Sequence, residues 1–116
     1  MCGITATFSY HPDAPPVDQG ELTRVRDAME RRGPDDAGLW IPEHKRVGLA
    51  HRRLAIIDLS EQGAQPMATP NGRLRTVFNG KLYNYRELRA RLQAQGHAFC
   101  SESDTEVLLH AYREYG

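Results

Sequence analysis

Residues 1–10 read MCGITATFSY, a cysteine followed by apolar residues that alternate with mostly hydroxyl-bearing ones. A period of two is typical of a strand, and it predicts a strand over residues 3–10. The apolar residues that share one face of this strand are Ile4, Ala6 and Phe8. The predicted strand begins directly after Cys2.

Removal of Met1 would make Cys2 the first residue, with its thiol and a free α-amino group on one Cα. An unperturbed cysteine thiol has a pKa of about 8.5, and an α-amino group one of about 7.7–8.0. Such an amine is largely neutral near neutral pH and takes the thiol proton, so one residue supplies nucleophile and general base. The alternative is an initiator methionine followed by a small residue, and only segments further along the chain decide between the two.

Composition places the chain among ordinary globular proteins, since 40% of its residues are apolar and 26% are charged. Its 116 residues suit one domain over residues 1–116. Fifteen basic residues balance fifteen acidic ones, so no net field recruits nucleic acid or an anionic membrane. No apolar run approaches the length of a membrane span, and the first residues lack the pattern of a secretory signal.

The cysteines and histidines exclude two kinds of site. Two cysteines are too few for a disulfide framework and indicate a reducing, cytoplasmic setting. Cys100, next to Phe99, is predicted to be a buried and unreactive thiol. The five histidines are scattered, and neither Cys-x-x-Cys nor His-Glu-x-x-His occurs, so the sequence predicts no metal site.

Three helices are predicted from their capping residues, Asp18, Asn84 and Ser103. Gly96 ends the second helix, and Glu106 forms a capping box with Ser103 in the third. The inward side chains expected in the third helix are Val107, Leu108, Ala111 and Tyr112. Short strands are expected at residues 38–41, 46–51, 54–58 and 73–78, the last after an Asn71-Gly72 turn. Strands that cluster and are followed by helices indicate an α+β fold, not alternating βαβ units.

Three further segments carry residue types suited to binding and catalysis. Residues 51–58 read HRRLAIID, with an arginine at the start of an apolar strand. Such an arginine can hold a carboxylate through two hydrogen bonds. The alternative interpretation is a basic loop exposed to solvent. Asn79-Gly80 can direct a side-chain amide and a backbone N–H at one oxygen, as in an oxyanion hole, but the dipeptide is also common in hairpins. Asp104 begins a helix, where the dipole alone favours a carboxylate and where a ligand ammonium would also be paired.

Taken in order, six segments resemble the glutaminase domain of class II glutamine amidotransferases, and most closely that of asparagine synthetase. They are MCGI at 1–4, RRGPDD at 31–36, AHRRLAIID at 50–58, GAQP at 63–66, FNGKLYNY at 78–85 and SDTEV at 103–107. They span nearly the whole chain without large gaps, and the ordered set is far more specific than any one member. The RGPD loop and the LAIID strand favour the asparagine synthetase branch over sugar-phosphate amidotransferases.

The resemblance implies an N-terminal-nucleophile hydrolase fold, an α/β/β/α sandwich of two stacked antiparallel sheets flanked by helices. It also implies hydrolysis of glutamine to glutamate and ammonia through a thioester on an N-terminal cysteine. The matching site residues are Cys2 as nucleophile, Asn79 and Gly80 as oxyanion donors, Arg53 for the glutamine carboxylate, Asp104 for its ammonium, and the backbone of Ile56 and Ile57 along the pocket.

Two features depart from the family pattern. Lys81 stands where the family usually has a glutamate that helps to receive the substrate ammonium. Its like charge predicts weaker glutamine affinity unless the long stem turns outward to water. The family's glutaminase domain also extends well beyond Gly116, so the chain is expected to be a truncated, N-terminal portion without the later strands and the synthetase domain.

No cofactor is expected in this segment, whereas ATP and magnesium are expected for the absent C-terminal synthetase domain, which passes the ammonia to aspartate. Glutamine and that domain are the expected partners, a homodimer is allowed, and neither nucleic acid nor a membrane is expected. Two alternatives stay open. One is a non-catalytic domain of the same fold, its pocket disabled by Lys81, a retained Met1 or truncation. The other is an amidotransferase that serves an acceptor other than aspartate.

Overall fold

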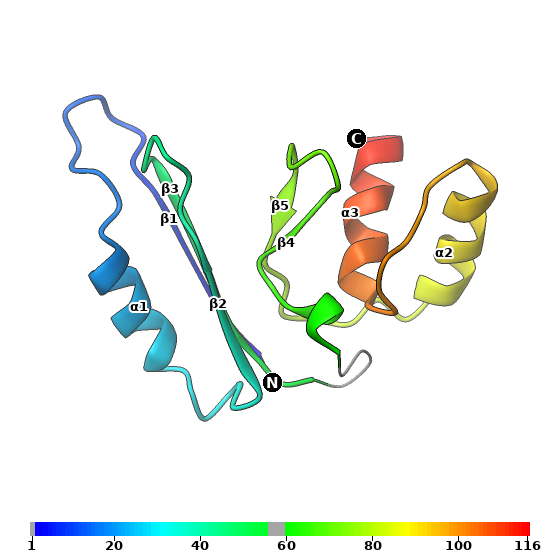
Figure 1. Ribbon diagram of the computed structural model, residues 1–116, viewed down its shortest axis with the longest axis horizontal. Coiled ribbons are helices and arrows are strands. Elements are labelled where there is room, and N and C mark those ends of the chain that lie inside the picture. Colours follow the sequence, from blue (N-terminus) through cyan, green and yellow to red (C-terminus); the bar gives the residue numbers. More distant parts are fainter. Residues whose placement is uncertain (1, 56–59) are drawn as a thin grey trace.

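A three-stranded antiparallel sheet forms the first part of the computed structural model, which describes residues 2–55 and 60–116 (Figure 1). Its strands are β1 (Gly3–Phe8), β2 (Asp36–Trp40) and β3 (Val47–Arg53). β3 is central and pairs with both neighbours, with Gly3 opposite Arg52 and Asp36 opposite Arg53. The starts of β1 and β2 therefore meet the end of β3 at one end of the sheet.

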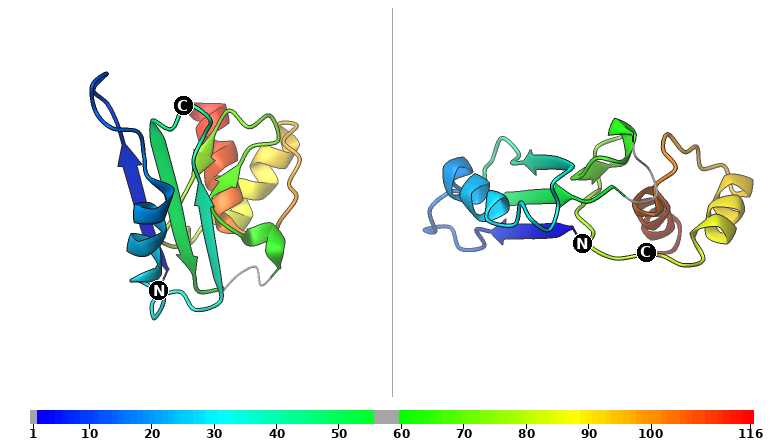
Figure 2. Two further views of the ribbon diagram at one scale, coloured as in Figure 1. Left: turned by 60° about the vertical axis from the view of Figure 1, so that its left-hand side comes forward. Right: turned by 90° about the horizontal axis from the view of Figure 1, so that it is seen from below.

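Helix α1 (Gln19–Asp27) covers one face of this sheet (Figure 2). Asp18 caps the helix, as the sequence predicts, by accepting a hydrogen bond from the Gly20 N–H at 2.9 Å. The core between helix and sheet consists of Val17, Leu22 and Ala50, with Leu39 and Ile41 packed against it. Gly48 permits this packing, since a Cβ there would lie 2.8 Å from the side chains of Val17 and Leu22.

The opposite face of the sheet looks toward a second sheet, behind which two helices lie (Figure 1). A short 3-10 helix, η1 (Glu61–Gly63), leads into the second sheet of β4 (Met67–Ala68) and β5 (Arg75–Thr76). Helix α3 (Asp104–Tyr115) contacts both of these strands and also α2 (Tyr85–Ala94). The layers thus follow the order helix, sheet, sheet, helix, in agreement with the expected α+β fold of α/β/β/α type.

The three predicted α-helices are present in the described part of the chain, and the residues predicted to cap or end them lie at their ends. Asn84 precedes α2, although its side chain makes no capping hydrogen bond. Gly96 follows α2 with a φ of +97°, a conformation that glycine adopts most readily. Ser103 caps α3 by accepting from the Thr105 N–H at 3.1 Å. Local capping chemistry therefore identified the helices correctly.

The predicted capping box at the start of α3 is wrong in its second half. The Glu106 carboxylate accepts hydrogen bonds from the backbone N–H groups of Cys100 and Ser101, at 2.8 and 2.7 Å, and from the Ser101 hydroxyl at 2.5 Å. It therefore holds the turn that enters the helix and not the capping residue itself. The loop passes close enough to the first helical turn for these earlier N–H groups to reach the carboxylate.

Two side chains that were predicted to be buried are exposed. Cys100 is exposed because Phe99 occupies the inward place, its ring 4.5 Å from that of His110. Tyr112, expected to face inward on α3, is 62% exposed, whereas Val107 and Leu109 on the same helix are buried. The buried face of α3 therefore includes Leu109 and excludes Tyr112, in contrast to the prediction.

The strands differ more from prediction than the helices do. Of the strand expected over 54–58, Leu54 and Ala55 are not in a strand, and the other residues lie outside the described part of the chain. The strand expected over 73–78 is reduced to Arg75–Thr76. The turn before it is confirmed, since Gly72 has a φ of +69° and donates to the Thr69 carbonyl oxygen at 2.8 Å.

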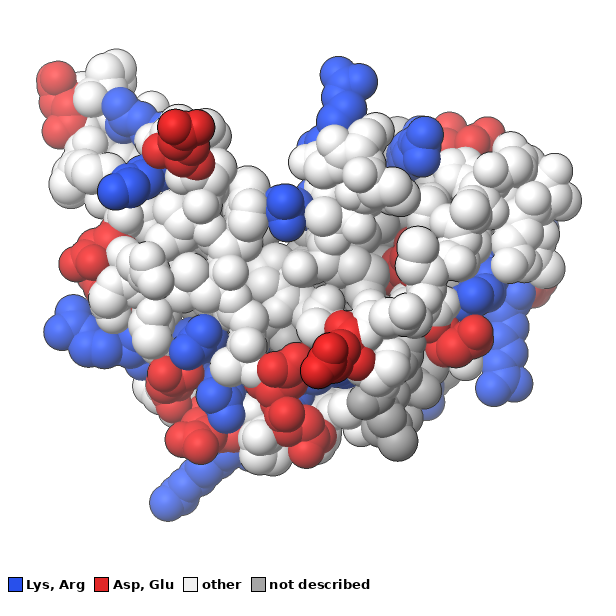
Figure 3. Space-filling model, in the orientation of Figure 1, with Lys and Arg blue, Asp and Glu red and all other residues white. Residues whose placement is uncertain are grey.

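Charged side chains of both signs lie on the face of the molecule that Figure 3 shows. On the face seen in Figure 3, basic and acidic side chains are interspersed, mostly around the periphery. This agrees with the equal numbers of basic and acidic residues, fifteen of each. Among the described residues, no helix has the length and apolar character needed to cross a bilayer.

Candidate functional site

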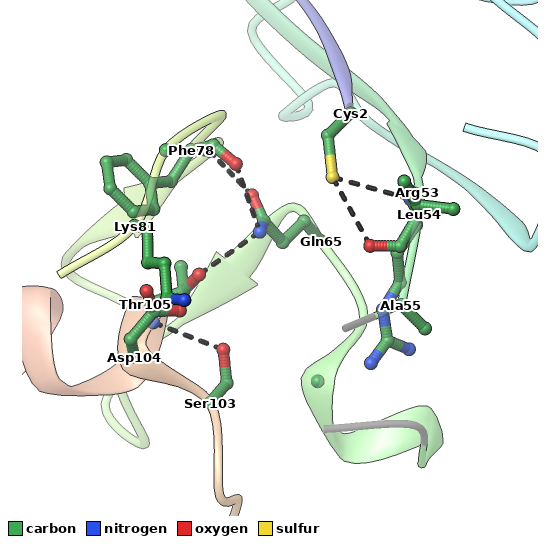
Figure 4. A pocket seen from close by; sticks show the side chains of 12 residues that line it. Cys2, Arg53, Leu54, Ala55, Gln65, Phe78, Lys81, Ser103, Asp104 and Thr105 are labelled. Carbon is green, nitrogen blue, oxygen red and sulfur yellow. Dashed lines mark hydrogen bonds between the residues drawn. The ribbon is translucent and has the colours of Figure 1, made fainter. Parts of the chain in front are cut away.

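A pocket opens between the end of β3 and the start of α3 (Figure 4). It is lined by five of the residues predicted from the sequence: Cys2, Arg53, Gly80, Lys81 and Asp104. In Figure 4 the cysteine and the arginine lie on one side of the pocket, and the lysine and the aspartate lie on the other. Folding thus brings residues far apart in sequence to one cavity.

The Cys2 thiol lies against the backbone just beyond β3. Its Sγ accepts a hydrogen bond from the Leu54 N–H at 3.4 Å and donates to the Leu54 carbonyl oxygen at 3.7 Å. Arg32 donates to the Cys2 carbonyl oxygen at 3.4 Å. Because Gly3 pairs with Arg52, the residue before β1 must lie beside the residues that follow β3. The register of β1 on β3 therefore sets the position of the Cys2 thiol beside Leu54.

Arg53 is the last residue of β3, and only 8% of it is exposed. Its Nη1 donates to the Ser60 carbonyl oxygen at 2.7 Å. Asp35 holds the backbone on both sides of this point. Its N–H donates to the Arg53 carbonyl oxygen at 2.9 Å, and its carboxylate accepts from the Ala55 N–H at 2.9 Å. The guanidinium is therefore presented from a fixed strand end.

Gly33 explains how the loop before β2 approaches β3 so closely. A Cβ at this position would lie 2.3 Å from the carbonyl carbon of Arg52, which no real side chain tolerates. The Arg52 side chain returns over the loop, and its Nε donates to the Gly33 carbonyl oxygen at 2.9 Å. Backbone proximity, and not a special dihedral angle, is what requires glycine here.

Asp104 is the first residue of α3 and is 6% exposed. Its Oδ2 accepts a hydrogen bond from the Leu82 N–H at 2.9 Å, which joins the start of the helix to the segment that follows Gly80. A carboxylate has acceptor sites for several donors, so this bond leaves capacity for a ligand. The helix N-terminus also favours its negative charge.

Lys81 lies at the rim of the same side of the pocket and is exposed. Its Nζ is 5.4 Å from the centroid of the Tyr83 ring. Among the ion pairs of the described residues, none joins Lys81 to Asp104. The ammonium therefore adds positive charge near the buried carboxylate without neutralising it through direct contact.

The remaining predicted residues are placed less directly. Gly80 lines the pocket and packs on the Phe78 ring, where a Cβ would lie 2.8 Å from the ring atoms. Asn79 is partly buried but is not among the residues that line the pocket. Ile56 and Ile57 lie outside the described residues.

Gln65 lines the pocket, and the sequence alone predicts no role for it. Its side-chain carbonyl accepts from the Phe78 N–H at 2.6 Å, and its amide nitrogen donates to the Phe78 carbonyl oxygen at 3.3 Å and to the Thr105 hydroxyl at 3.2 Å. The GAQP segment was recognised only as part of the family pattern. No local signal pointed to this role, because all its partners are distant in sequence.

His51, in the first sheet, also contacts the Phe78 carbonyl oxygen. It is fully buried, and its Nε2 lies 3.3 Å from the Phe78 carbonyl oxygen, so the neutral ring carries its proton on Nε2. Among the described residues, Nδ1 has no hydrogen-bond partner. Burial lowers the pKa of His51, the Phe78 contact opposes that shift, and the charges of Arg53 and Asp36 act in opposite directions. A neutral ring is therefore favoured in the folded protein.

The pocket can bind a molecule that has an anionic group, a cationic group and an electrophilic carbon. An arginine and an aspartate on opposite sides suit a carboxylate and an ammonium, and the thiol supplies a nucleophile. Among the described residues, no group of three or more histidines, cysteines, aspartates or glutamates is arranged to hold a metal ion.

Comparison with known proteins gives consistent matches. Residues 1–116 match the family described as the glutamine amidotransferase domain. Asparagine synthetase [glutamine-hydrolyzing] 1 of Bacillus subtilis is 47% identical over 116 residues, and asparagine synthetase [glutamine-hydrolyzing] 3 of the same organism is 44% identical over 117. Each alignment covers 99% of this chain. Amidase chry2 of Gibberella zeae is 40% identical over 125 residues, covering the whole chain. The chain spans 18% of the length of each of these three relatives.

Proposed function

The chain belongs to the glutamine amidotransferase domain family, and on this premise we propose that it hydrolyses glutamine to glutamate and ammonia. The observation that carries the proposal is a single pocket lined by a thiol, a guanidinium and a carboxylate, on Cys2, Arg53 and Asp104. These groups match the side-chain amide, the α-carboxylate and the α-ammonium of glutamine.

In the proposed mechanism, removal of Met1 frees the amine of Cys2, which takes the thiol proton. The thiolate attacks the side-chain amide carbon of glutamine and forms a carbon–sulfur bond. The tetrahedral intermediate collapses by breaking the carbon–nitrogen bond, and ammonia leaves with the proton that the amine returns. Water then hydrolyses the thioester, which releases glutamate and restores the thiol.

Binding of the amino-acid end is assigned to residues on opposite sides of the pocket. Arg53 is proposed to hold the α-carboxylate, since a guanidinium offers two parallel N–H donors. Asp104 is proposed to pair with the α-ammonium from its buried position at the helix start. The backbone of Ile56 and Ile57 is assigned to the pocket wall by its match to the family pattern.

Asn79 and Gly80 are the proposed oxyanion donors. The Gly80 backbone lies at the pocket wall, and the Asn79 amide would turn toward the same oxygen when glutamine binds. Catalytic hydrogen bonds are often poorly aligned before substrate binds. One such donor typically contributes roughly 10²–10³ in rate.

Several relatives are named glutamine-hydrolysing asparagine synthetases, so we extend the proposal to the larger protein. There, the ammonia would pass to a C-terminal synthetase domain that uses ATP and magnesium to convert aspartate. We also propose a cytoplasmic location, because Cys2 and Cys100 are both free thiols. A homodimer is compatible with the family resemblance and would be read from light scattering of the full-length protein.

One comparison favours a second candidate within the family. Amidase chry2 is similar over the whole chain yet is not named an asparagine synthetase. An amidotransferase with an acceptor other than aspartate therefore remains the alternative. A non-catalytic domain of the same fold, with the pocket disabled by Lys81 or by a retained Met1, is the rival from a different class.

Ammonia release from glutamine by the full-length protein tests the proposal, alongside its Cys2→Ala variant and an intact-mass measurement. We expect loss of the mass of one methionine, activity in the parent and none in the variant. Release of ammonia by Cys2→Ala at the parent rate would contradict the assignment of the nucleophile. Retention of Met1 in an inactive parent would favour the non-catalytic domain.

A further inference from the structure

We propose that Gln65 is a positioning residue that sets the distance between the oxyanion donors and the ammonium-binding carboxylate. The inference rests on the proposed glutaminase function and assigns a role to a residue outside the reacting groups. In Figure 4, Gln65 lies between the cysteine side and the aspartate side of the pocket.

The Gln65 side chain uses both ends of its amide. Its oxygen accepts from the Phe78 N–H at 2.6 Å, and its nitrogen donates to the Phe78 carbonyl oxygen at 3.3 Å. This pair of bonds imitates the exchange between two strands and fixes the peptide units on both sides of one residue. The nitrogen also donates to the Thr105 hydroxyl at 3.2 Å. One planar group thus holds two segments that do not otherwise belong to the same sheet.

The two segments held are the ones that carry the proposed chemistry. Phe78 immediately precedes Asn79-Gly80, the proposed oxyanion donors. Thr105 immediately follows Asp104, the proposed partner of the ammonium. A shift of the Gln65 amide would therefore move the donors relative to the site where the substrate is held. Displacement by about 1 Å can reduce a rate on the order of 10²-fold.

The Gln65 backbone is itself placed by the first sheet. A Cβ on Gly38 would lie 1.7 Å from the Gln65 carbonyl oxygen, so only glycine in β2 lets this segment lie directly on the sheet. His51, opposite Gly38 in the sheet, reaches the Phe78 carbonyl oxygen at 3.3 Å from the same face. The amide of Gln65 therefore transmits the position of a rigid sheet to the oxyanion loop.

Kinetics of the Gln65→Glu variant in the full-length protein test the proposal. Glutamate keeps an oxygen for the Phe78 N–H but places a second oxygen against the Phe78 carbonyl oxygen, where a donor is needed, and the Thr105 hydroxyl would have to turn and donate instead of accept. We expect kcat for glutamine hydrolysis to fall about 10- to 100-fold, because the oxyanion donors are misplaced. KM should stay within about threefold, because Arg53 and Asp104 are unchanged. A residue with only a structural role would not separate kcat from KM in this way.

Thr105→Val and Thr105→Ser form a milder matched pair in case the first variant folds poorly. Valine has the shape of threonine without its acceptor, so kcat should fall about three- to tenfold, because one of the three Gln65 bonds is lost. Serine keeps the hydroxyl, so Thr105→Ser should have the kcat and KM of the parent. Parent kcat in both Gln65→Glu and Thr105→Val, or a rise in KM with kcat unchanged, would overturn the proposal.

Amide hydrogen exchange of Phe78 provides a readout that does not depend on activity. We expect faster exchange in Gln65→Glu than in the parent, because repulsion between the second carboxylate oxygen and the Phe78 carbonyl oxygen displaces the loop, so the bond to that N–H opens more often. Unchanged exchange would overturn the role of Gln65 even if the enzyme is active. An inactive parent with faster exchange in the variant would instead contradict the proposed function and leave Gln65 as the anchor of the loop.

Discussion

Asp104→Asn should weaken glutamine binding far more than it weakens the fold. Asparagine has the same shape, and its carbonyl oxygen can still accept from the Leu82 N–H, which lies 2.9 Å from Oδ2. The variant removes the negative charge and replaces one acceptor oxygen by an N–H donor, and both changes disfavour an ammonium. Because Asp104 is 6% exposed, the lost charge pair with the substrate ammonium is poorly screened by solvent.

The expected sizes of the two effects differ clearly. A hydrogen bond to a charged group contributes about 1.5–3 kcal/mol, which corresponds to an increase in the glutamine KM of about 10- to 140-fold. Loss of a carboxylate at a helix N-terminus costs only about 0.3–1 kcal/mol of stability. We therefore expect a large rise in KM, a smaller change in kcat and a slightly lower melting temperature.

Steady-state ammonia release and thermal unfolding of the full-length protein would measure both quantities. Glu102→Gln is the matched control, since it removes a neighbouring carboxylate whose side chain is 80% exposed. That control should leave KM and kcat unchanged. A KM for Asp104→Asn within about twofold of the parent, in a folded variant, would refute the assignment of Asp104 to the substrate ammonium.

Two further predictions concern charge near the same pocket. Lys81→Glu should lower the glutamine KM on the order of tenfold, because an exposed like charge near the substrate ammonium is replaced by an opposite one, with Lys81→Gln between the two; an unchanged KM would show that this side chain does not influence the substrate. Stability should fall as the pH drops below about 6.5, because the pKa of His51 is lower in the folded protein and the unfolded chain then binds more protons. His51→Gln, which keeps a donor for the Phe78 carbonyl, should flatten the dependence of melting temperature on pH between about 5 and 7; an equally steep profile would exclude His51 as the titrating group.

Helices were predictable because their signals are local. Asp18, Ser103 and Gly96 act on backbone groups within a few positions of themselves, so their effect can be read without knowing the fold. The exposure of Cys100 was not predictable in this way. It depends on Phe99 taking the inward place beside His110, which lies on a different element.

The grouping of the candidate site residues was predictable only where residue type and family pattern coincide. Cys2, Arg53 and Asp104 carry chemistry that the residue types suggest, and the structure brings all three to one pocket. Gln65 carries no such signal. Its contacts with Phe78 and Thr105 span 13 and 40 positions, and neither helical nor strand periodicity relates residues at those distances.

Two glycines show how this long-range placement is nevertheless encoded. Gly33 lets the loop before β2 lie against the backbone of Arg52, which fixes the end of β3 and, through strand register, the adjacent thiol of Cys2. Gly38 lets Gln65 lie on the same sheet, and Gln65 then fixes the loop that follows Phe78. The proposed nucleophile and the proposed oxyanion loop are thus both positioned by one sheet. Their relative position is therefore set by backbone contacts that any side chain at either glycine would prevent.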